Sequence, residues 1–207
     1  MIVVIDYNVG NVRSVCNAFR HIGFDAELSC DPGAIEKGSG LVLPGVAAFG
    51  FAIEALGELA QRIGRIALEG KPLLGICVGY QMLFESSSEF GRYEGLGLIG
   101  GSVGPIPKGR VIPHMGWNEV ELPADMELFA GLGSGKHFYF AHSFCADVSD
   151  DQTQIAYTDY GVPLVASVQK GNIYGTQFHP EKSGPQGLDV LRNFAAICRG
   201  ETPGGRA

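Results

Sequence analysis

The sequence has few basic residues and no long uncharged hydrophobic run. It contains 15 Lys and Arg against 22 Asp and Glu among 207 residues, for a formal net charge of −7. This balance argues against nucleic acid as the main partner, because neutralising phosphates requires clustered Lys and Arg. The uncharged run at 72–84 is well short of the roughly 20 residues that span a bilayer. No basic leader precedes the first apolar run, so no signal peptide and no membrane partner are expected.

Cysteine is scarce and shows no pairing pattern. The chain has five Cys, an odd number, and none of them forms a Cys-x-x-Cys pair. This usage favours a reducing, cytoplasmic compartment over a disulfide framework, and it leaves any one Cys available as a nucleophile. No Cys and His have the spacing of zinc ligands, so neither a metal nor another cofactor is expected. With 45% hydrophobic residues, the chain has enough apolar material for a core, which excludes a disordered protein.

The first half of the chain alternates apolar runs with helical patterns. Buried strands are expected at 2–6, 24–28, 41–43 and 72–76. Helices are expected at 11–22, at 51–68 as one long amphipathic helix, and from 77 to about 84. Such alternation is typical of an α/β fold with a mostly parallel central sheet that is flanked by helices on both faces.

The second half has the short runs and turn signals of antiparallel strands. Strands are expected at 110–113, 118–122, 136–145, 154–158, 164–169 and 173–178, as hairpins added to or extending the sheet. A closing helix is expected at 187–199. Because no linker or repeat divides the chain, residues 1–207 are expected to form a single domain, with 200–207 as a flexible tail.

Cys77 lies at the centre of the segment Gly-Ile-Cys-Val-Gly at 75–79, between a predicted buried strand and a predicted helix. Hydrolases carry Ser at the centre of the same turn. The turn is so sharp that the residues two before and two after the nucleophile need almost no side chain. The nucleophile then projects at a helix N-terminus, where free N–H groups stabilise a thiolate and bind an oxyanion. The alternative is a small buried hydrophobic residue, the usual role of a free Cys.

His179 is the best candidate for the base that a thiol nucleophile needs. It ends a predicted strand at the edge where open α/β sheets place their sites. Glu181 would lie on the same side if the chain stays extended, and its carboxylate would fix one tautomer of the imidazole. The alternative, an exposed His beside a solvated Glu, is less favoured once the cysteine turn upstream is considered.

Six segments together resemble a known family. Three of them resemble the class I, or triad, glutamine amidotransferases: LPGV at 43–46, GICVGYQ at 75–81 and FHPEKS at 178–183. The other three resemble the glutaminase subunits of imidazole glycerol phosphate synthase, in histidine biosynthesis: DYNVGNVRSV at 6–15, PHMGWN at 113–118 and FYFAHSF at 138–144. The resemblance extends from the first strand to the last helix.

The resemblance implies a Cys-His-Glu triad that hydrolyses glutamine. Cys77 would attack the side-chain amide carbon, and His179, oriented by Glu181, would pass the thiol proton to the leaving ammonia. Water activated by His179 would then release glutamate from the thioester. The implied oxyanion and substrate residues are the loop at Gly45 and Val46, the N–H of Val78, the side chain of Gln81, and the backbone around His142 and Ser143.

The resemblance also implies a partner, because ammonia released into water becomes ammonium and stops being a nucleophile. The family docks on a cyclase subunit, a (β/α)8 barrel, as a heterodimer and passes ammonia through it. The residues implied to line or flank the docking face are Asn11, His114, Trp117, Asn118 and Lys182. The only Trp, Trp117, lies among chain breakers and fits an interface anchor better than a core residue. Lys182 as a surface charge of little energetic value is the alternative for that position.

Two residues depart from the family pattern. Ala47 follows PGV where the family usually has Gly, and Phe144 stands where it commonly has Tyr. An Ala in the left-handed region costs roughly 1–2 kcal/mol. If the active conformation flips the peptide at this loop, we therefore expect a rarely populated oxyanion hole in the absence of partner and substrate.

Three other functions are compatible with parts of the sequence. A different free-standing amidotransferase subunit, such as the one that serves pyridoxal phosphate synthesis, would not share PHMGWN and DYNVGN. A non-catalytic binding module would be expected to lose at least one of Cys77, His179 and Glu181. A general cysteine hydrolase would differ from a glutaminase in its response to a glutamine-analogue inactivator.

Overall fold

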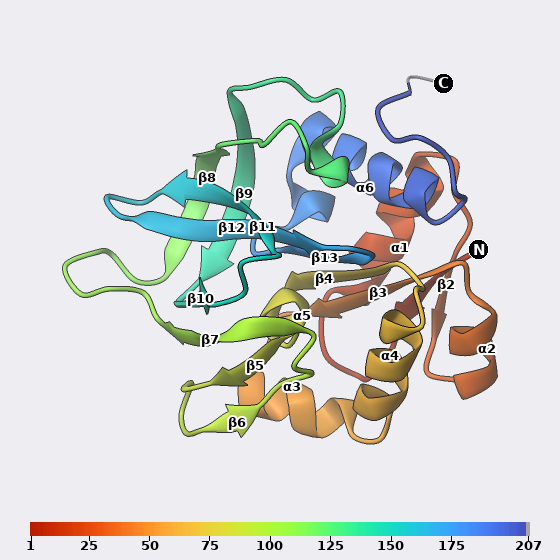
Figure 1. Cartoon of the computed structure of the whole chain (residues 1–207), viewed down its shortest axis with the longest axis horizontal. Coiled ribbons are helices and arrows are strands. Elements are labelled where there is room, and N and C mark those ends of the chain that lie inside the picture. Colours follow the sequence, from red (N-terminus) through yellow and green to blue (C-terminus); the bar gives the residue numbers. More distant parts are fainter. Residues whose placement is uncertain (206–207) are drawn as a thin grey trace.

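A nine-stranded sheet forms the centre of the computed structural model, which describes residues 1–205 (Figure 1). The parallel strands, in spatial order, are β2 (Ala26–Ser29), β1 (Ile2–Ile5), β3 (Gly40–Gly45), β4 (Leu73–Cys77) and β13 (Ile173–Thr176). The sheet continues with antiparallel pairings through β12 (Pro163–Lys170), β11 (Gln154–Asp159), β8 (His114–Val120) and β9 (Lys136–His142). The expected α/β class and the added antiparallel strands are confirmed.

Helices cover both faces of this sheet. One face carries α1 (Val12–His21) and α6 (Gly184–Ile197), and the other carries α2 (Pro32–Lys37), α3 (Phe49–Leu56) and α4 (Leu59–Leu68) (Figure 1). Strands β1, β3 and β4 are buried at every position. Continuous burial is what two covered faces require, and it explains why these strands are uninterrupted apolar runs in the sequence.

A second sheet of four strands lies beside the first. Its order is β10 (Phe144–Val148), β7 (Ile99–Pro105), β5 (Phe84–Ser87) and β6 (Tyr93–Glu94). The β10–β7 and β5–β6 pairs are antiparallel, and β5–β7 is parallel. Only Ser143 separates β9 from β10, so the chain passes directly from one sheet to the other beside the carboxyl end of β9.

Several expected elements were wrong in extent or type. The single helix at 51–68 is two helices, α3 and α4, because Gly57 adopts φ +52° and ends the first one. The helix after Cys77 is only α5 (Val78–Gln81), because the Leu83 carbonyl accepts the N–H groups of Leu98 and Ile99 instead of continuing a helix.

Two expected strands also need correction. The strand at 136–145 is two strands, β9 and β10, in different sheets. Residues 110–113 form no strand. Helix α2 and strands β5, β6 and β7 were not expected, although the Asp31 side chain caps α2 by accepting the N–H of Ala34 at 2.8 Å. The remaining elements occur with shifted boundaries.

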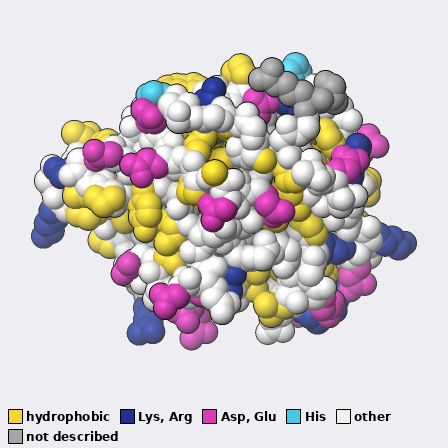
Figure 2. Space-filling model, turned by 45° about the horizontal axis from the view of Figure 1, so that its top comes forward, with side chains coloured by type: hydrophobic (Ala, Val, Ile, Leu, Met, Phe, Trp, Pro, Cys, Tyr) yellow, Lys and Arg dark blue, Asp and Glu magenta, His cyan; other side chains and the backbone are white. Residues whose placement is uncertain are grey.

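Charged side chains are mixed on the surface. Figure 2 shows acidic and basic groups interspersed over one face, without a basic stripe. None of the helices in residues 1–205 is long and apolar enough to cross a membrane.

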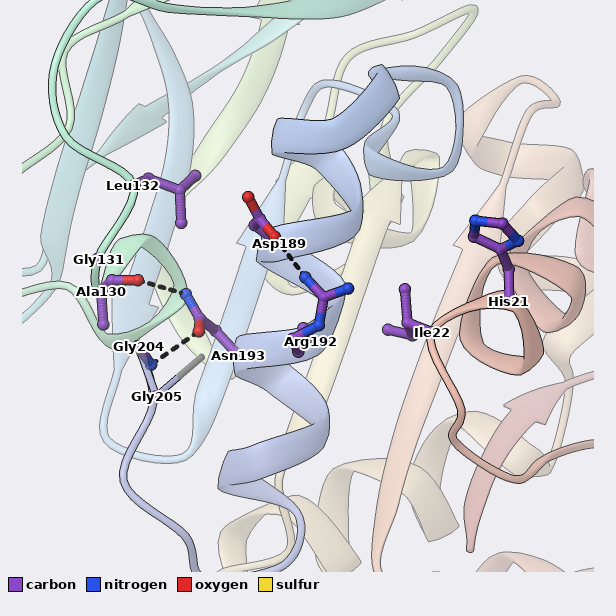
Figure 3. A pocket seen from close by; sticks show the side chains of 10 residues that line it. All are labelled: His21, Ile22, Ala130, Gly131, Leu132, Asp189, Arg192, Asn193, Gly204 and Gly205. Atoms are coloured by element: carbon purple, nitrogen blue, oxygen red, sulfur yellow. Dashed lines mark hydrogen bonds and ion pairs between the residues drawn. The ribbon is translucent and has the colours of Figure 1, made fainter. Parts of the chain in front are cut away.

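The C-terminal segment returns to α6. The Gly204 N–H donates to Asn193 Oδ1 at 2.9 Å (Figure 3). The Asn193 amide donates in turn to two carbonyls, that of Leu128 within the 3-10 turn η1 (Glu127–Phe129) and that of Ala130 directly after it. These contacts lie beside a pocket of about 520 Å³ that His21 and Arg192 also line. The flexible tail expected at 200–207 stays a prediction, and residues 206–207 lie outside the described part of the chain.

Candidate active site

Cys77 is the last residue of β4 and immediately precedes α5. Its backbone has φ +56°, a left-handed conformation that is rare and strained for a side chain of this kind. The side chain is 4% exposed. The expected strand–turn–helix context is therefore present, but α5 has only four residues, so its dipole is small and the free N–H groups of the turn matter more.

The two glycines that flank Cys77 have no room for a side chain. A Cβ on Gly79 would lie 1.7 Å from the Leu43 oxygen, and one on Gly75 would lie 2.6 Å from the Gly79 oxygen. Both contacts are with backbone atoms, which have little freedom to shift. Close backbone packing thus explains why this turn needs glycine on both sides of Cys77.

His179 and Glu181 form a buried pair. His179 Nδ1 lies 2.9 Å from Glu181 Oε1, and the two side chains are 3% and 1% exposed. Burial by itself lowers the pKa of His179, but hydrogen bonds to Cys77 and Glu181 outweigh it and raise the pKa to about 9. With Nδ1 occupied by Glu181, Nε2 is the nitrogen left for Cys77, so the imidazole is suited to hold the thiol proton at neutral pH.

The contact between His179 and Glu181 does not arise as expected. The chain does not stay extended after His179, because Pro180–Lys182 form the 3-10 turn η2. Strand β9 holds both ends of this turn: the Tyr139 carbonyl accepts the His179 N–H at 2.9 Å, and the Tyr139 N–H donates to Ser183 Oγ at 3.0 Å. Ser183 Oγ in turn donates to the His179 carbonyl at 2.6 Å. Neither Tyr139 nor Ser183 carries a signal in the sequence that marks it as a support of the base.

A pocket of about 490 Å³ opens over Cys77 and His179. Five of the expected oxyanion and substrate residues line it, namely Val46, Val78, Gln81, His142 and Ser143. The sixth, Gly45, lies just behind, where a Cβ would be 3.0 Å from the Cβ of Val78. Gly45 is also the partner of Cys77 in the β3–β4 register. The tertiary structure therefore brings the loop after β3 next to the cysteine turn.

The loop after β3 is held in place from the other side. The Tyr7 hydroxyl donates to the Pro44 carbonyl, and Tyr7 is buried. Ala47 lines the pocket and is not among the residues with positive φ in the described chain. Its present conformation is thus not the left-handed one that a peptide flip would require.

Gln81 and His142 are bonded to the same backbone carbonyl. Gln81 Nε2 donates to the Phe144 oxygen at 3.2 Å, and His142 Nδ1 donates to it at 2.8 Å. His142 Nε2 lies 2.9 Å from His114 Nδ1. Burial lowers the pKa of each of these two His to about 4, so both are neutral at pH 7. His142 therefore supports the backbone of the pocket wall rather than acting as a base.

Glu89 is a pocket residue that the sequence analysis missed. It follows β5, and its Oε2 accepts the Phe49 N–H at 2.6 Å. The neighbouring Phe90 is 85% exposed at the pocket mouth and has φ +54°. An acidic residue in a short turn carries little signal in one sequence, because most such residues are solvated.

Of the residues expected at a docking face, Lys182 lines this pocket, and Trp117, Asn118 and His114 line a neighbouring pocket that shares Met115 with it. Trp117 is 54% exposed, Lys182 is exposed and lines the pocket, and Asn118 donates to the Asp159 carbonyl at 2.8 Å. Asn11 is half-buried and accepts from Ser14 Oγ. His114, by contrast, is 3% exposed, stacked between the rings of Phe140 and Tyr160. It flanks this face from beneath.

Within residues 1–205, no group of three or more His, Cys, Asp or Glu is placed to hold a metal ion.

The family described as "Glutamine amidotransferase class-I" matches residues 3–198. A protein named imidazole glycerol phosphate synthase subunit HisH, from Methanothermobacter thermautotrophicus, is 49% identical over 96% of this chain and 100% of its own length. Proteins of the same name from Moorella thermoacetica and Lacticaseibacillus casei are 44% and 48% identical, over 96% and 97% of this chain and 95% and 98% of their own lengths.

Solved structures show the same fold at lower identity. A structure of PurLQS from Thermotoga maritima has a TM-score of 0.76 at 23% identity, over 95% of this chain and 97% of the other. A structure described as a glutamine amidotransferase has a TM-score of 0.77 at 20% identity, over 97% and 100%. At these identities the likeness concerns the fold alone.

Proposed function

The chain belongs to the class I glutamine amidotransferase family, and from that premise we propose that it is the glutaminase subunit of imidazole glycerol phosphate synthase. It hydrolyses glutamine to glutamate and ammonia for histidine biosynthesis. The observation that carries this assignment is the 49% identity to a HisH subunit over 96% of the chain. The buried contact between His179 and Glu181 beside Cys77 supports the chemistry, because a thiol nucleophile needs an oriented base.

The first half-reaction uses Cys77 and His179. The Cys77 thiolate attacks the side-chain amide carbon of glutamine, and a carbon–sulfur bond forms. As the carbon–nitrogen bond breaks, His179 gives the former thiol proton to the leaving nitrogen, which departs as ammonia. Glu181 keeps Nδ1 of His179 occupied, so that Nε2 faces the reacting atoms.

The second half-reaction restores the enzyme. His179 takes a proton from water, the hydroxide attacks the thioester carbon, and the carbon–sulfur bond breaks to give glutamate and the Cys77 thiolate. In both halves the negative oxygen needs backbone donors. The Val78 N–H is one such donor, and the loop at Gly45 and Val46 supplies the other.

The pocket walls suit the other end of glutamine. The Glu89 carboxylate lines the pocket and provides a negative group for the α-ammonium. The backbone around His142 and Ser143, held by the bond from His142 to Phe144, receives the α-carboxylate. Gln81 lies on the same wall as a further contact.

A cyclase subunit, a (β/α)8 barrel, docks over the pocket mouth and receives the ammonia. Trp117 and Lys182, which are exposed, and Asn118 and Asn11, which are half-buried, form the docking face, and His114 supports it from beneath. Closure of the mouth by the partner keeps the ammonia away from water, in which it would be protonated. The complex works in the cytoplasm, which fits the odd number of Cys and the lack of a pairing pattern expected of a reducing compartment.

The test is glutamate release from glutamine by the purified chain, alone and with a cognate cyclase subunit and its nucleotide ligand. Strong stimulation by the cyclase, abolished in Cys77→Ala, is the expected result. Brisk release that is indifferent to the cyclase would point to another amidotransferase subunit. No release in either condition would overturn the enzymatic assignment.

A further inference from the structure

Gln177 is a fully buried polar side chain that the mechanism above does not use. It lies between β13 and His179 and is 0% exposed. Its backbone N–H donates to the Ala166 carbonyl at 2.8 Å, which fixes the main chain at this point. Its side-chain amide makes two contacts: Oε1 with Gln81 Nε2 at 2.8 Å, and Nε2 with the Sγ of Cys77 at 3.8 Å.

The surrounding bonds determine which way the Gln177 amide points. The Phe144 carbonyl is an acceptor only, so Gln81 must turn its NH2 group towards it. The second hydrogen of that NH2 group then faces Gln177, which must present its oxygen. The N–H groups of Gln177 are therefore directed at the sulfur of Cys77.

The sulfur of Cys77 has two different polar neighbours apart from His179. The Ala141 carbonyl lies 4.0 Å away and is an acceptor, so it suits a thiol and repels a thiolate. The Gln177 amide is a donor and favours the thiolate. In a site where the side chain is almost completely buried, such a donor replaces the water that would otherwise solvate the negative charge.

We propose that Gln177 is a positioning residue for the nucleophile: its amide N–H holds the sulfur of Cys77 in place and stabilises the thiolate against the opposing carbonyl of Ala141. Gln81 orients Gln177, so the wall of the substrate pocket and the nucleophile share one hydrogen-bonded unit. This inference rests on the proposed function, because it takes Cys77 as the nucleophile.

The test measures the rate at which iodoacetamide alkylates Cys77 as a function of pH, followed by mass spectrometry of the peptide that contains it. Gln177→Met keeps the length of the side chain and removes both polar contacts. Gln177→Glu keeps an oxygen for Gln81 and removes the donor to sulfur. Gln169→Met is the matched control, because Gln169 is also a buried glutamine of the large sheet but is bonded to Glu127.

Both variants at position 177 are expected to move the midpoint of the alkylation profile upward by about one pH unit, a roughly tenfold slower reaction at neutral pH. Gln169→Met is expected to lower only the thermal stability. An unchanged profile in a folded Gln177→Met or Gln177→Glu protein would overturn the proposal. If neither variant folds, Gln81→Met, which removes the group that orients Gln177, is measured in their place, and an unchanged profile in that protein would overturn the proposal.

The alkylation measurement needs neither glutamine nor the cyclase. A shifted profile in the variants, together with no glutamate release by the wild-type complex, would refute the proposed function and leave the role of Gln177 intact. Glutamate release by the wild-type complex, together with an unshifted profile in the variants, would support the proposed function and overturn the role of Gln177.

Discussion

Trp117 and Tyr139 stand opposite each other in the β8–β9 register, and their rings meet edge to face with 6.2 Å between centroids. Trp117 is exposed beside the pocket mouth, whereas the backbone of Tyr139 is bonded to both His179 and Ser183. One cross-strand pair therefore separates the proposed docking face from the turn that carries the base.

Trp117→Ala is expected to weaken binding of the cyclase subunit by about 2 kcal/mol or more, because a partly exposed aromatic at the centre of an interface is a typical energetic anchor. Binding is measured by titration calorimetry with the purified cyclase. The control is Leu68→Ala, because Leu68 is also an exposed hydrophobic residue, 74% exposed. It is the last residue of α4 and precedes the start of β4, whereas Cys77 lies at the other end of that strand. Equal loss of affinity in both variants would contradict the proposed docking face.

Ala47→Gly is expected to raise glutaminase activity in the absence of the partner. Glycine adopts the left-handed region at little cost, whereas alanine pays roughly 1–2 kcal/mol, so the peptide flip would become about ten times more frequent. The measurement is glutamate release by the isolated chain, with the activity of the cyclase complex as a reference. No change, or a fall, would count against a flip at this loop.

Glu181→Gln is expected to slow glutamate release by at least about tenfold, because the imidazolium loses its charged partner. The pH dependence of stability should change too. The pKa of His179 is raised to about 9 from 6.5, so its favourable contribution is complete below about pH 6.5 and is lost as the pH rises through 9. The wild-type free energy of unfolding should fall by up to ~3 kcal/mol over that window.

In Glu181→Gln this fall should be smaller, since one of the two bonds that raise the pKa of His179 is weakened. Urea unfolding at several pH values between 6 and 10 measures both proteins. Parallel curves would show that Glu181 does not support the charged form of His179.

Gly79→Ala is expected to destabilise the fold by several kcal/mol, on the order of 3 or more, because the new Cβ would collide with the Leu43 carbonyl. Gly64→Ala is the matched control: Gly64 lies within α4 and a Cβ there meets nothing within 4 Å. That substitution should stabilise the protein by roughly 0.5–1 kcal/mol, as alanine is the better helix former. Thermal unfolding of both variants checks the contrast, and similar melting temperatures would refute the steric argument.

The sequence by itself determined the features that depend on neighbours along the chain. The glycines around Cys77 mark a sharp turn because the backbone there has no room for side chains, and the apolar runs of β1, β3 and β4 mark buried parallel strands. His179 and Glu181 can be identified as a pair from the sequence because they are two residues apart. Even so, the 3-10 turn that joins them was not predicted, since β9 imposes it from outside.

Only the tertiary structure decided the remaining relationships. Gln177 and Cys77 are 100 residues apart and meet because β13 and β4 are adjacent parallel strands. His114 is buried although its neighbours are exposed, because the alternation of β8 turns it inward between Phe140 and Tyr160. The small sheet has no clear local signal in the sequence, because β7 pairs with β10 about forty residues further on. Short glycine-rich strands gain their stability from such partners rather than from local preference.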